Sequence, residues 1–147
     1  MRSVFLAVLG LSLVGCSSTP PPVQSGQVCF RCKRPITDAK LGVQMINVAG
    51  QTSTFRTPGC LARYLADHPT EARDIYVTDY PSGKLFPVSR ALFVRGKIDE
   101  ATTERDYFAF ASVNDAVERA KDVTGRIVDW SAVRSGIEAE KLQKKTD

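Results

Sequence analysis

Four cysteines are the residues of this sequence whose spacing could support chemistry. Cys29 and Cys32 form a Cys-x-x-Cys motif, Cys-Phe-Arg-Cys, which places two sulfur atoms within one turn. Such a pair suits a metal chelate or a reversible disulfide, and the adjacent Lys33 and Arg34 would stabilise thiolates. A lone pair is a weak signal, because a zinc site normally uses a second pair and this sequence has none.

Cys60 supplies a third thiol. It follows Thr57-Pro58-Gly59, which predicts a short helix capped by Thr57, with Pro58 at its first position and its end near Asp67. We expect a lowered pKa for Cys60, because the unpaired N–H groups at a helix start favour an anion. The simpler interpretation is that Cys60 is a small buried residue.

Three thiolates suit a soft ion of low coordination number, such as Cu(I), better than a closed tetrahedral zinc site. We therefore predict that Cys29, Cys32 and Cys60 are metal ligands. Met45 is a weaker candidate, because a methionine in a strand is more often a core residue. The single histidine, His68, precedes Pro69 at a helix end and is expected to be exposed.

Nothing in the sequence indicates an enzyme. A Ser/His/Asp set would have to use the one histidine, and no glycine-rich phosphate loop is visible. The acidic pairs Asp99-Glu100 and Glu104/Asp106 resemble loop charges. We predict no catalytic residue.

The N-terminal segment has the layout of a lipoprotein signal. Arg2 precedes an apolar run over 4–14, which is too short to span a bilayer, and Leu13-Val14-Gly15-Cys16 reads as a lipobox. We predict a signal peptide over 1–15, a lipid on Cys16 that anchors the chain in a membrane, and a flexible linker up to residue 27. Because Ser17 and not Asp follows Cys16, we expect the outer membrane, with the protein facing the periplasm.

Length, composition and charge exclude other classes. Hydrophobic residues make up 43% of the 147 residues, which excludes wholesale disorder, and one domain is the prior at this length. The net charge of +4 is weakly basic and is not the clustered charge of a nucleic-acid-binding protein.

The rest of the chain predicts an α+β fold of two tandem ββαβ units, an internal duplication. Both units place a phenylalanine two residues before a helix cap, Phe55 before Thr57 and Phe110 before Ser112. The elements expected are strands at 41–48, 51–55 and 75–78 around the first helix, then strands at 85–94, 106–111 and 126–129 around a helix from 112 to about 123. The rival interpretation is coincidence between two ordinary α+β stretches.

These elements set the predicted boundaries. The globular region spans 28–133, with units at about 28–83 and 84–133, and a charged helix or tail follows over 134–147. The last helix, from Ser131 to about Lys145, is amphipathic at best, and we expect it on the outside in contact with solvent.

The order and spacing of these motifs resemble the NosL family, lipid-anchored accessory proteins that carry copper for nitrous oxide reductase. The resemblance runs over nearly the whole mature chain up to Val133. It rests on Cys16, Cys29-Phe-Arg-Cys32, Phe55 with Cys60-Leu-Ala-Arg-Tyr64, Tyr76-Val-Thr-Asp79-Tyr80-Pro-Ser-Gly83, Ala91-Leu-Phe-Val94, Phe108-Ala-Phe110-Ala-Ser112, Ala116, Gly125 and Trp130.

The resemblance implies two ββαβ units and the binding and delivery of Cu(I) in the periplasm. Family members usually have Gly-Met after the second cysteine, where this chain has Lys33-Arg34. They also tend to have a Pro-Met-Gly loop, where this chain has 99–104 without methionine. Ligation by Cys29, Cys32 and Cys60 alone would replace the missing thioethers.

The leading hypothesis is a lipid-anchored Cu(I) carrier that hands the ion to a copper enzyme of the nitrous oxide reductase type. One alternative is a thiol–disulfide lipoprotein, with Cys29 and Cys32 as the reversible pair and Cys60 as a resolving or free thiol. The other is a non-catalytic interaction lipoprotein whose cysteines are structural.

Overall fold

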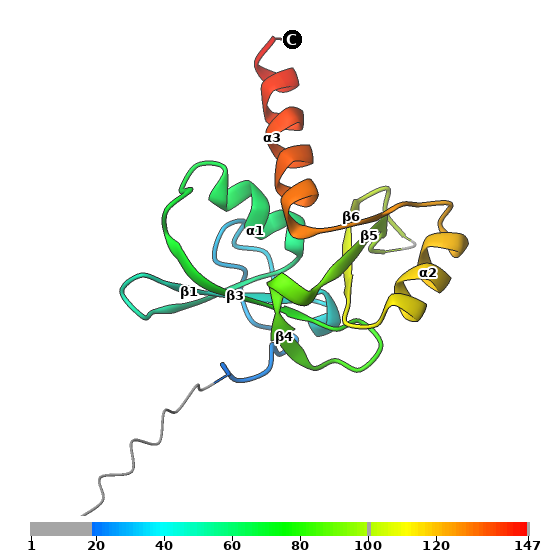
Figure 1. Cartoon of the computed structure of the whole chain (residues 1–147). Coiled ribbons are helices and arrows are strands. Elements are labelled where there is room, and N and C mark those ends of the chain that lie inside the picture. The colour runs from blue at the N-terminus through cyan, green and yellow to red at the C-terminus, as the bar shows by residue number, and fades with distance from the viewer. Residues whose placement is uncertain (1–18, 100, 147) are drawn as a thin grey trace, which may run out of the picture.

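A computed structural model describes residues 19–99 and 101–146 of the chain. The predicted signal peptide, Cys16 with its predicted lipid, and Ser17 lie outside these residues. The described part of the chain is α+β, with two antiparallel sheets and three α-helices (Figure 1). Within the described residues, no helix is both long and apolar enough to cross a membrane.

The first sheet has the strand order β2-β1-β3-β4 and carries helix α1. Strand β1 pairs with β2 on one side and with β3 on the other, so that Val43 lies opposite both Phe55 and Val77. The elements are β1 (Val43–Asn47), β2 (Thr52–Phe55), α1 (Pro58–Leu65), β3 (Ala72–Thr78) and β4 (Leu85–Pro87).

The second sheet has the order β6-β5-β7, again with the first strand of the unit in the middle. Its helix is capped as predicted, since the Ser112 hydroxyl accepts a hydrogen bond from the Asp115 amide at 3.5 Å. The elements are β5 (Leu92–Lys97), β6 (Arg105–Phe110), α2 (Val113–Asp122) and β7 (Ile127–Val128). Both units thus follow the order ββαβ; that a duplication produced them stays a prediction.

The strand expected over 85–94 is wrong as a single element. Leu85–Pro87 pairs with β3 at the edge of the first sheet, and a 3₁₀ turn over Val88–Arg90 then redirects the chain into the second sheet. Pro87 has no N–H to donate, and proline is tolerated in a sheet only at such an edge. The segment expected as one strand therefore contributes its first part to the first sheet and its last part to the second sheet.

The two sheets share one main core. It includes Val43, Phe55 and Leu61 of the first unit together with Phe93 and Tyr107 of the second. Because strand residues alternate between faces, Val43 and Met45 point toward α1, whereas Gln44 points to the opposite face.

The outer position expected for the last helix, α3 (Trp130–Thr146), is wrong for its first turns. Val133 and Ile137 are 0% and 3% exposed and belong to the main core, and the helix packs against α1. Burying such side chains contributes about 1.5–3 kcal/mol each. Only the later turns are free of the core, as the 67% exposure of Leu142 shows.

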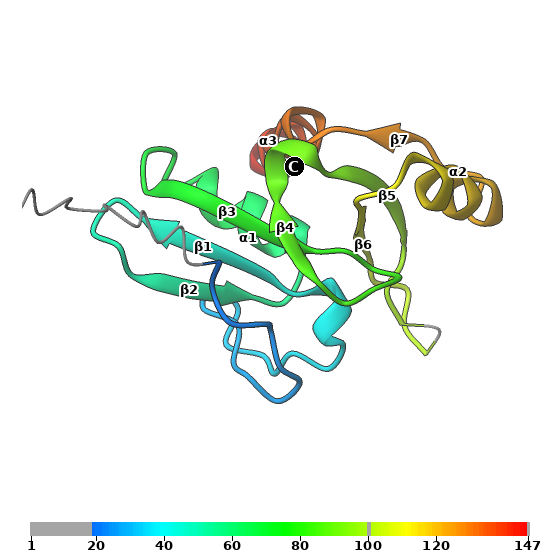
Figure 2. The same cartoon turned by 60° about the horizontal axis from the view of Figure 1, so that its bottom comes forward.

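Part of the predicted linker also packs against the domain. The Gln44 amide donates to the Pro21 carbonyl at 2.8 Å, and Val23, at 8% exposure, covers Gly42. The N-terminal segment therefore lies on the face of the first sheet opposite α1, as the two views show (Figures 1 and 2). The composition of the segment did not indicate this packing.

Candidate metal centre

The Cys-x-x-Cys motif forms a tight loop fastened to the edge of the first sheet. The Cys29 amide donates to the Arg34 carbonyl at 2.9 Å, and the Lys33 amide donates back to the Cys29 carbonyl at 3.0 Å. Lys33 closes the turn with a φ of 59°, and the Phe30 amide donates to the Thr54 carbonyl of β2 at 2.8 Å. These hydrogen bonds fix the backbone of the loop, and the Cys29 and Cys32 side chains extend from the same turn.

Cys60 is the third residue of α1, as predicted. Thr57 caps the helix, since its hydroxyl accepts a hydrogen bond from the Cys60 amide at 3.1 Å, and Pro58 opens the first turn. Because β2 leads directly into this helix and also holds the Cys-x-x-Cys loop through the Phe30–Thr54 hydrogen bond, β2 brings Cys60 to the loop.

The three sulfur atoms converge. Cys29 Sγ lies 3.5 Å from Cys60 Sγ, and all three sulfurs lie within 4.8 Å of one another. Three sulfurs around one ion at a metal–sulfur distance of about 2.3 Å are separated by about 4 Å, so the cluster already has the size of a metal site. Cys29 and Cys60 are buried, whereas Cys32 is partly exposed.

All three of these cysteines are free thiols. The 3.5 Å between Cys29 and Cys60 is a hydrogen-bond distance and not a bond, since a disulfide has an S–S length of about 2.05 Å. The sulfurs can therefore act as donors to a metal ion.

The negative charge of the cluster rests on Cys29. The Cys60 thiol donates to its sulfur, and the backbone amides of Cys32 and Arg56 add further hydrogen bonds, which together outweigh burial and lower the pKa of Cys29 well below its ordinary value of 9.0. The hydrogen bond that Cys60 gives to Cys29, together with burial, raises the pKa of Cys60. The predicted lowering of the Cys60 pKa is therefore wrong.

Asp106 occupies the same helix start as Cys60. Its carboxylate lies at the start of α1, where it accepts hydrogen bonds from the Gly59 amide and the Thr57 hydroxyl, both at 2.8 Å. It is only 3% exposed. The positive end of the helix is therefore already compensated by a carboxylate from β6. The prediction that Asp106 is a loop charge is wrong.

Glu104 lies in the loop just before β6, as predicted, but its ion pairs were not predicted. It forms ion pairs with Arg34, at 3.0 Å, and with Arg56. Burial raises the pKa of Glu104, but the hydrogen bonds from these two arginines outweigh it, and the pKa is lowered overall. Hydrogen bonds to Glu104, and then to Cys32, raise the pKa of Arg34, so this guanidinium reaches the sulfur cluster. Arg34 and Glu104, from the two segments in which NosL-like proteins have methionines, thus place charge beside the thiols.

The remaining candidates lie outside the cluster or in the core. Met45 is 1% exposed and packs in the same core as Cys29 and Cys60. His68 is exposed, as predicted, and its ring stacks on Tyr64 with centroids 4.2 Å apart. Among the described His, Cys, Asp and Glu residues, the group that could hold a metal consists of the three cysteines.

The cluster opens to solvent through a pocket of about 260 Å³. Cys32 and Cys60 line it together with Arg34, Arg56 and Glu104. A metal ion could therefore enter and leave on the side of Cys32, the most exposed of the three thiols.

Fold and site together define a small α+β protein with a three-thiol cluster between a strand-edge loop and a helix start. The structure is similar to the crystal structure of the copper chaperone NosL from Shewanella denitrificans, with a TM-score of 0.60 and 17% sequence identity. The match covers 76% of this chain and 96% of that protein. The predicted resemblance to NosL is thus confirmed for the fold.

Comparisons at the level of sequence are negative. No model of a known protein family matches the chain, and no curated protein matches it. The likeness to NosL rests on the three-dimensional arrangement.

The charge distribution in the cluster predicts a thiolate at neutral pH. Because the pKa of Cys29 is lowered, its ionisation stabilises the metal-free fold above the ordinary cysteine pKa, and this contribution is lost as the pH falls through the lowered value. We expect the ultraviolet absorbance of one thiolate to persist at pH 7 in the reduced protein and to be absent at that pH in Cys29→Ser. Identical titrations of the two proteins near pH 9.0 would contradict this assignment.

Proposed function

We propose that the protein is a lipid-anchored periplasmic carrier that binds Cu(I) through Cys29, Cys32 and Cys60 and transfers it to another protein. The observation that carries the proposal is the convergence of three free thiols within 4.8 Å of one another. Two of the three cysteines are buried, and the third, Cys32, is partly exposed. The NosL-like fold supports it, because the similar crystal structure is that of a copper chaperone.

The donor set favours Cu(I) over Zn(II). Thiolates bind both ions, but structural zinc is almost always held by four ligands, whereas a soft Cu(I) ion accepts three. The described residues offer three thiolates here, and the candidate fourth ligand, His68, is exposed and stacked on Tyr64. An ion with three sulfur ligands can also be passed on by exchange of one thiolate at a time, starting at Cys32.

Competition at equilibrium tests this function. Reduced protein should hold one Cu(I) per chain against a chromogenic Cu(I) chelator, and excess Zn(II) should not displace the ion. If the chelator removes all Cu(I) while the protein is in excess, the carrier function is wrong.

The anchor and the recipient belong to the same proposal. The lipobox that ends at Cys16 supports lipidation, and the Ser17 that follows supports the outer membrane. The resemblance to NosL supports a copper enzyme of the nitrous oxide reductase type as recipient.

Lipidation has its own test. Cells that express the full chain and are fed labelled palmitate should incorporate the label, and Cys16→Ser should abolish incorporation and release the protein from membranes. Cys32→Ser is the matched control, because it removes a cysteine of the metal site and should leave the label unchanged.

The 3.5 Å between Cys29 and Cys60 supports a second candidate function, a thiol–disulfide protein. The pair favoured by this distance is Cys29–Cys60, not the Cys29–Cys32 pair expected from the motif. Mass spectrometry of protein purified from the periplasm without reductant distinguishes the two functions. A free-thiol or metal-bound cluster favours the carrier, and a reducible Cys29–Cys60 disulfide favours redox activity.

A further inference from the structure

The mouth of the thiol cluster lies in a strongly basic surface. Two pockets of about 260 and 280 Å³ adjoin there and share Arg31, Arg63 and Lys144. Eight arginine and lysine side chains line the two pockets, against four carboxylates. This excess of four positive charges equals the net charge of +4 of the whole chain, so the basic character of the protein is concentrated at this site.

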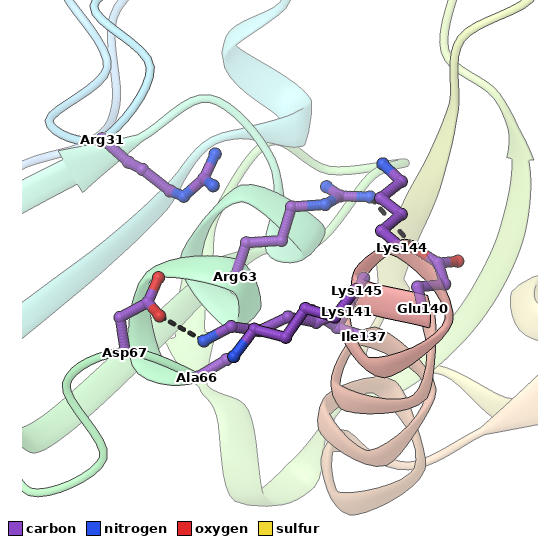
Figure 3. Close-up of a pocket in the computed structure, with 9 residues that line it drawn as sticks. All are labelled: Arg31, Arg63, Ala66, Asp67, Ile137, Glu140, Lys141, Lys144 and Lys145. Carbon is purple, nitrogen blue, oxygen red and sulfur yellow. Dashed lines mark hydrogen bonds and ion pairs between the residues drawn. The ribbon is translucent and has the colours of Figure 1, made fainter. Parts of the chain in front are cut away.

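Half of these cations are already neutralised. Arg63 pairs with Asp106 and Glu140, Lys141 pairs with Asp67, and Glu104 serves both Arg34 and Arg56. Figure 3 shows the pairs of Arg63 and Lys141 at the floor of the second pocket.

The other half lacks a partner. Within the described part of the chain, no carboxylate lies within ion-pairing distance of four exposed cations, Arg31, Arg105, Lys144 and Lys145, which we call the basic rim. The rim comes from three separate elements: the Cys-x-x-Cys loop, β6 and α3 (Figure 3 shows its members on the loop and on α3).

Four unpaired cations around the one accessible thiol have an electrostatic consequence. Clefts lined by charge of one sign raise the association rate of partners of the opposite sign by about 10 to 1,000-fold. A protein that takes or gives an ion at Cys32 must bring its own metal ligands to the pocket, so its surface must contact the rim. A small anion fits less well, because Asp67 and Glu140 line the same pocket.

The position of the N-terminal segment argues against a membrane as the partner of this surface. Pro21 and Val23 pack on the face of the first sheet opposite α1. Cys16 is five residues before Pro21, a span of at most about 18 Å. A lipid at Cys16 therefore holds that opposite face near the membrane and leaves the rim directed away from it.

We propose that the basic rim docks an acidic surface on the protein that exchanges Cu(I) with Cys32. This inference rests on the proposed carrier function and adds the chemistry of the partner. The partner presents carboxylates around its own metal-binding site, and the four rim cations pair with them during transfer.

Two synthetic acceptor peptides test the docking. Both carry the same Cys-x-x-Cys sequence, flanked by glutamates in one peptide and by glutamines in the other. At low salt, Cu(I) transfer from the loaded protein should be about tenfold faster to the glutamate peptide, at the low end of known steering effects. The difference should vanish near 1 M salt, where the Debye length is about 3 Å.

Matched charge variants locate the effect. The triple variant Arg31→Gln, Lys144→Gln, Lys145→Gln should lose the preference for the glutamate peptide. The control Lys84→Gln, Lys121→Gln, Arg126→Gln removes the same charge from exposed positions outside both pockets and should keep it. Equal rates for the two peptides, or an equal effect of both triple variants, would overturn the docking proposal.

Two further measurements keep this test separate from the carrier function. Chelator competition should give the rim variant the Cu(I) affinity of the parent, so that slower transfer reports docking. If the protein holds no Cu(I), anisotropy of the labelled glutamate peptide still tests docking to the metal-free protein. Rim-dependent binding to phosphatidylglycerol vesicles without any peptide preference would overturn the proposal in favour of a lipid surface.

Discussion

Replacing Cys29 with serine is expected to weaken Cu(I) binding more than 100-fold. Loss of a residue that only supports a metal ligand costs about 10 to 100-fold, and Cys29 is itself a predicted ligand. It is also the fully buried member of the cluster and the one whose thiolate is stabilised by neighbouring hydrogen bonds. Cys32→Ser and Cys60→Ser should weaken binding in the same direction, as chelator competition would show.

Met45→Leu is the matched control for this series. Leucine conserves the volume of a core methionine and usually costs less than about 1.5 kcal/mol, so the fold should persist. Because the proposed site uses thiolates alone, the Cu(I) affinity should stay that of the parent. If Met45→Leu loses as much Cu(I) affinity as Cys29→Ser, ligation by three thiolates alone is wrong and the site includes the Met45 thioether.

Replacing Asp106 with alanine is expected to cost about 3–5 kcal/mol of stability, because three buried donors lose their acceptor at about 1–3 kcal/mol each. The carboxylate accepts hydrogen bonds from the Thr57 hydroxyl and from the amides of Gly59 and Tyr107, and it pairs with Arg63. Without it, the start of α1 loses its carboxylate, and Arg63 keeps Glu140 as its one remaining partner. Urea unfolding followed by the fluorescence of Trp130 measures the effect.

Two further variants make this prediction specific. Asp122→Ala removes an exposed carboxylate from α2 and should change stability by less than about 0.5 kcal/mol. Gly59→Ala keeps the carboxylate but places a Cβ 2.6 Å from its oxygens, so we expect a loss of about 1–3 kcal/mol from overpacking. If Asp106→Ala is as stable as Asp122→Ala, the carboxylate does not hold the two units together.

Local signals in the sequence predicted the parts of the fold that depend on neighbours along the chain. Thr57 and Ser112 cap the two helices, and each accepts a hydrogen bond from the amide three residues later. Such a cap can be recognised from the sequence because it depends only on neighbouring residues. The Cys-x-x-Cys motif and the position of Cys60 three residues after its cap likewise indicated which thiols would be brought together.

Contacts between distant segments could not be predicted in the same way. The burial of Asp106 and the ion pairs of Glu104 were not predicted, because their partners, the start of α1, Arg34 and Arg56, come from the other unit. The lowered pKa expected for Cys60 is wrong for a different reason, since the expectation treated α1 as an isolated helix and left out the hydrogen bond to Cys29 and the burial of the thiol. The order of charges along the sequence does not show which strand lies beside α1. The position of Asp106 depends on the packing of β6 against that helix.

The errors in secondary structure also have tertiary causes. The run over 85–94 has strand composition throughout, yet Leu85–Pro87 joins one sheet and β5 joins the other. The first turns of α3 are buried because Val133 and Ile137 close the core beside α1, although the charge of the later turns dominates the pattern.

X-ray absorption at the copper edge of the Cu(I)-loaded protein tests the central claim most directly, because it reports the atoms bound to the ion. The proposal predicts a first shell of three sulfur atoms, one from each of Cys29, Cys32 and Cys60, and the loss of one sulfur in each single serine variant. A first shell that contains nitrogen or oxygen in the parent, or that is unchanged by Cys60→Ser, would contradict it.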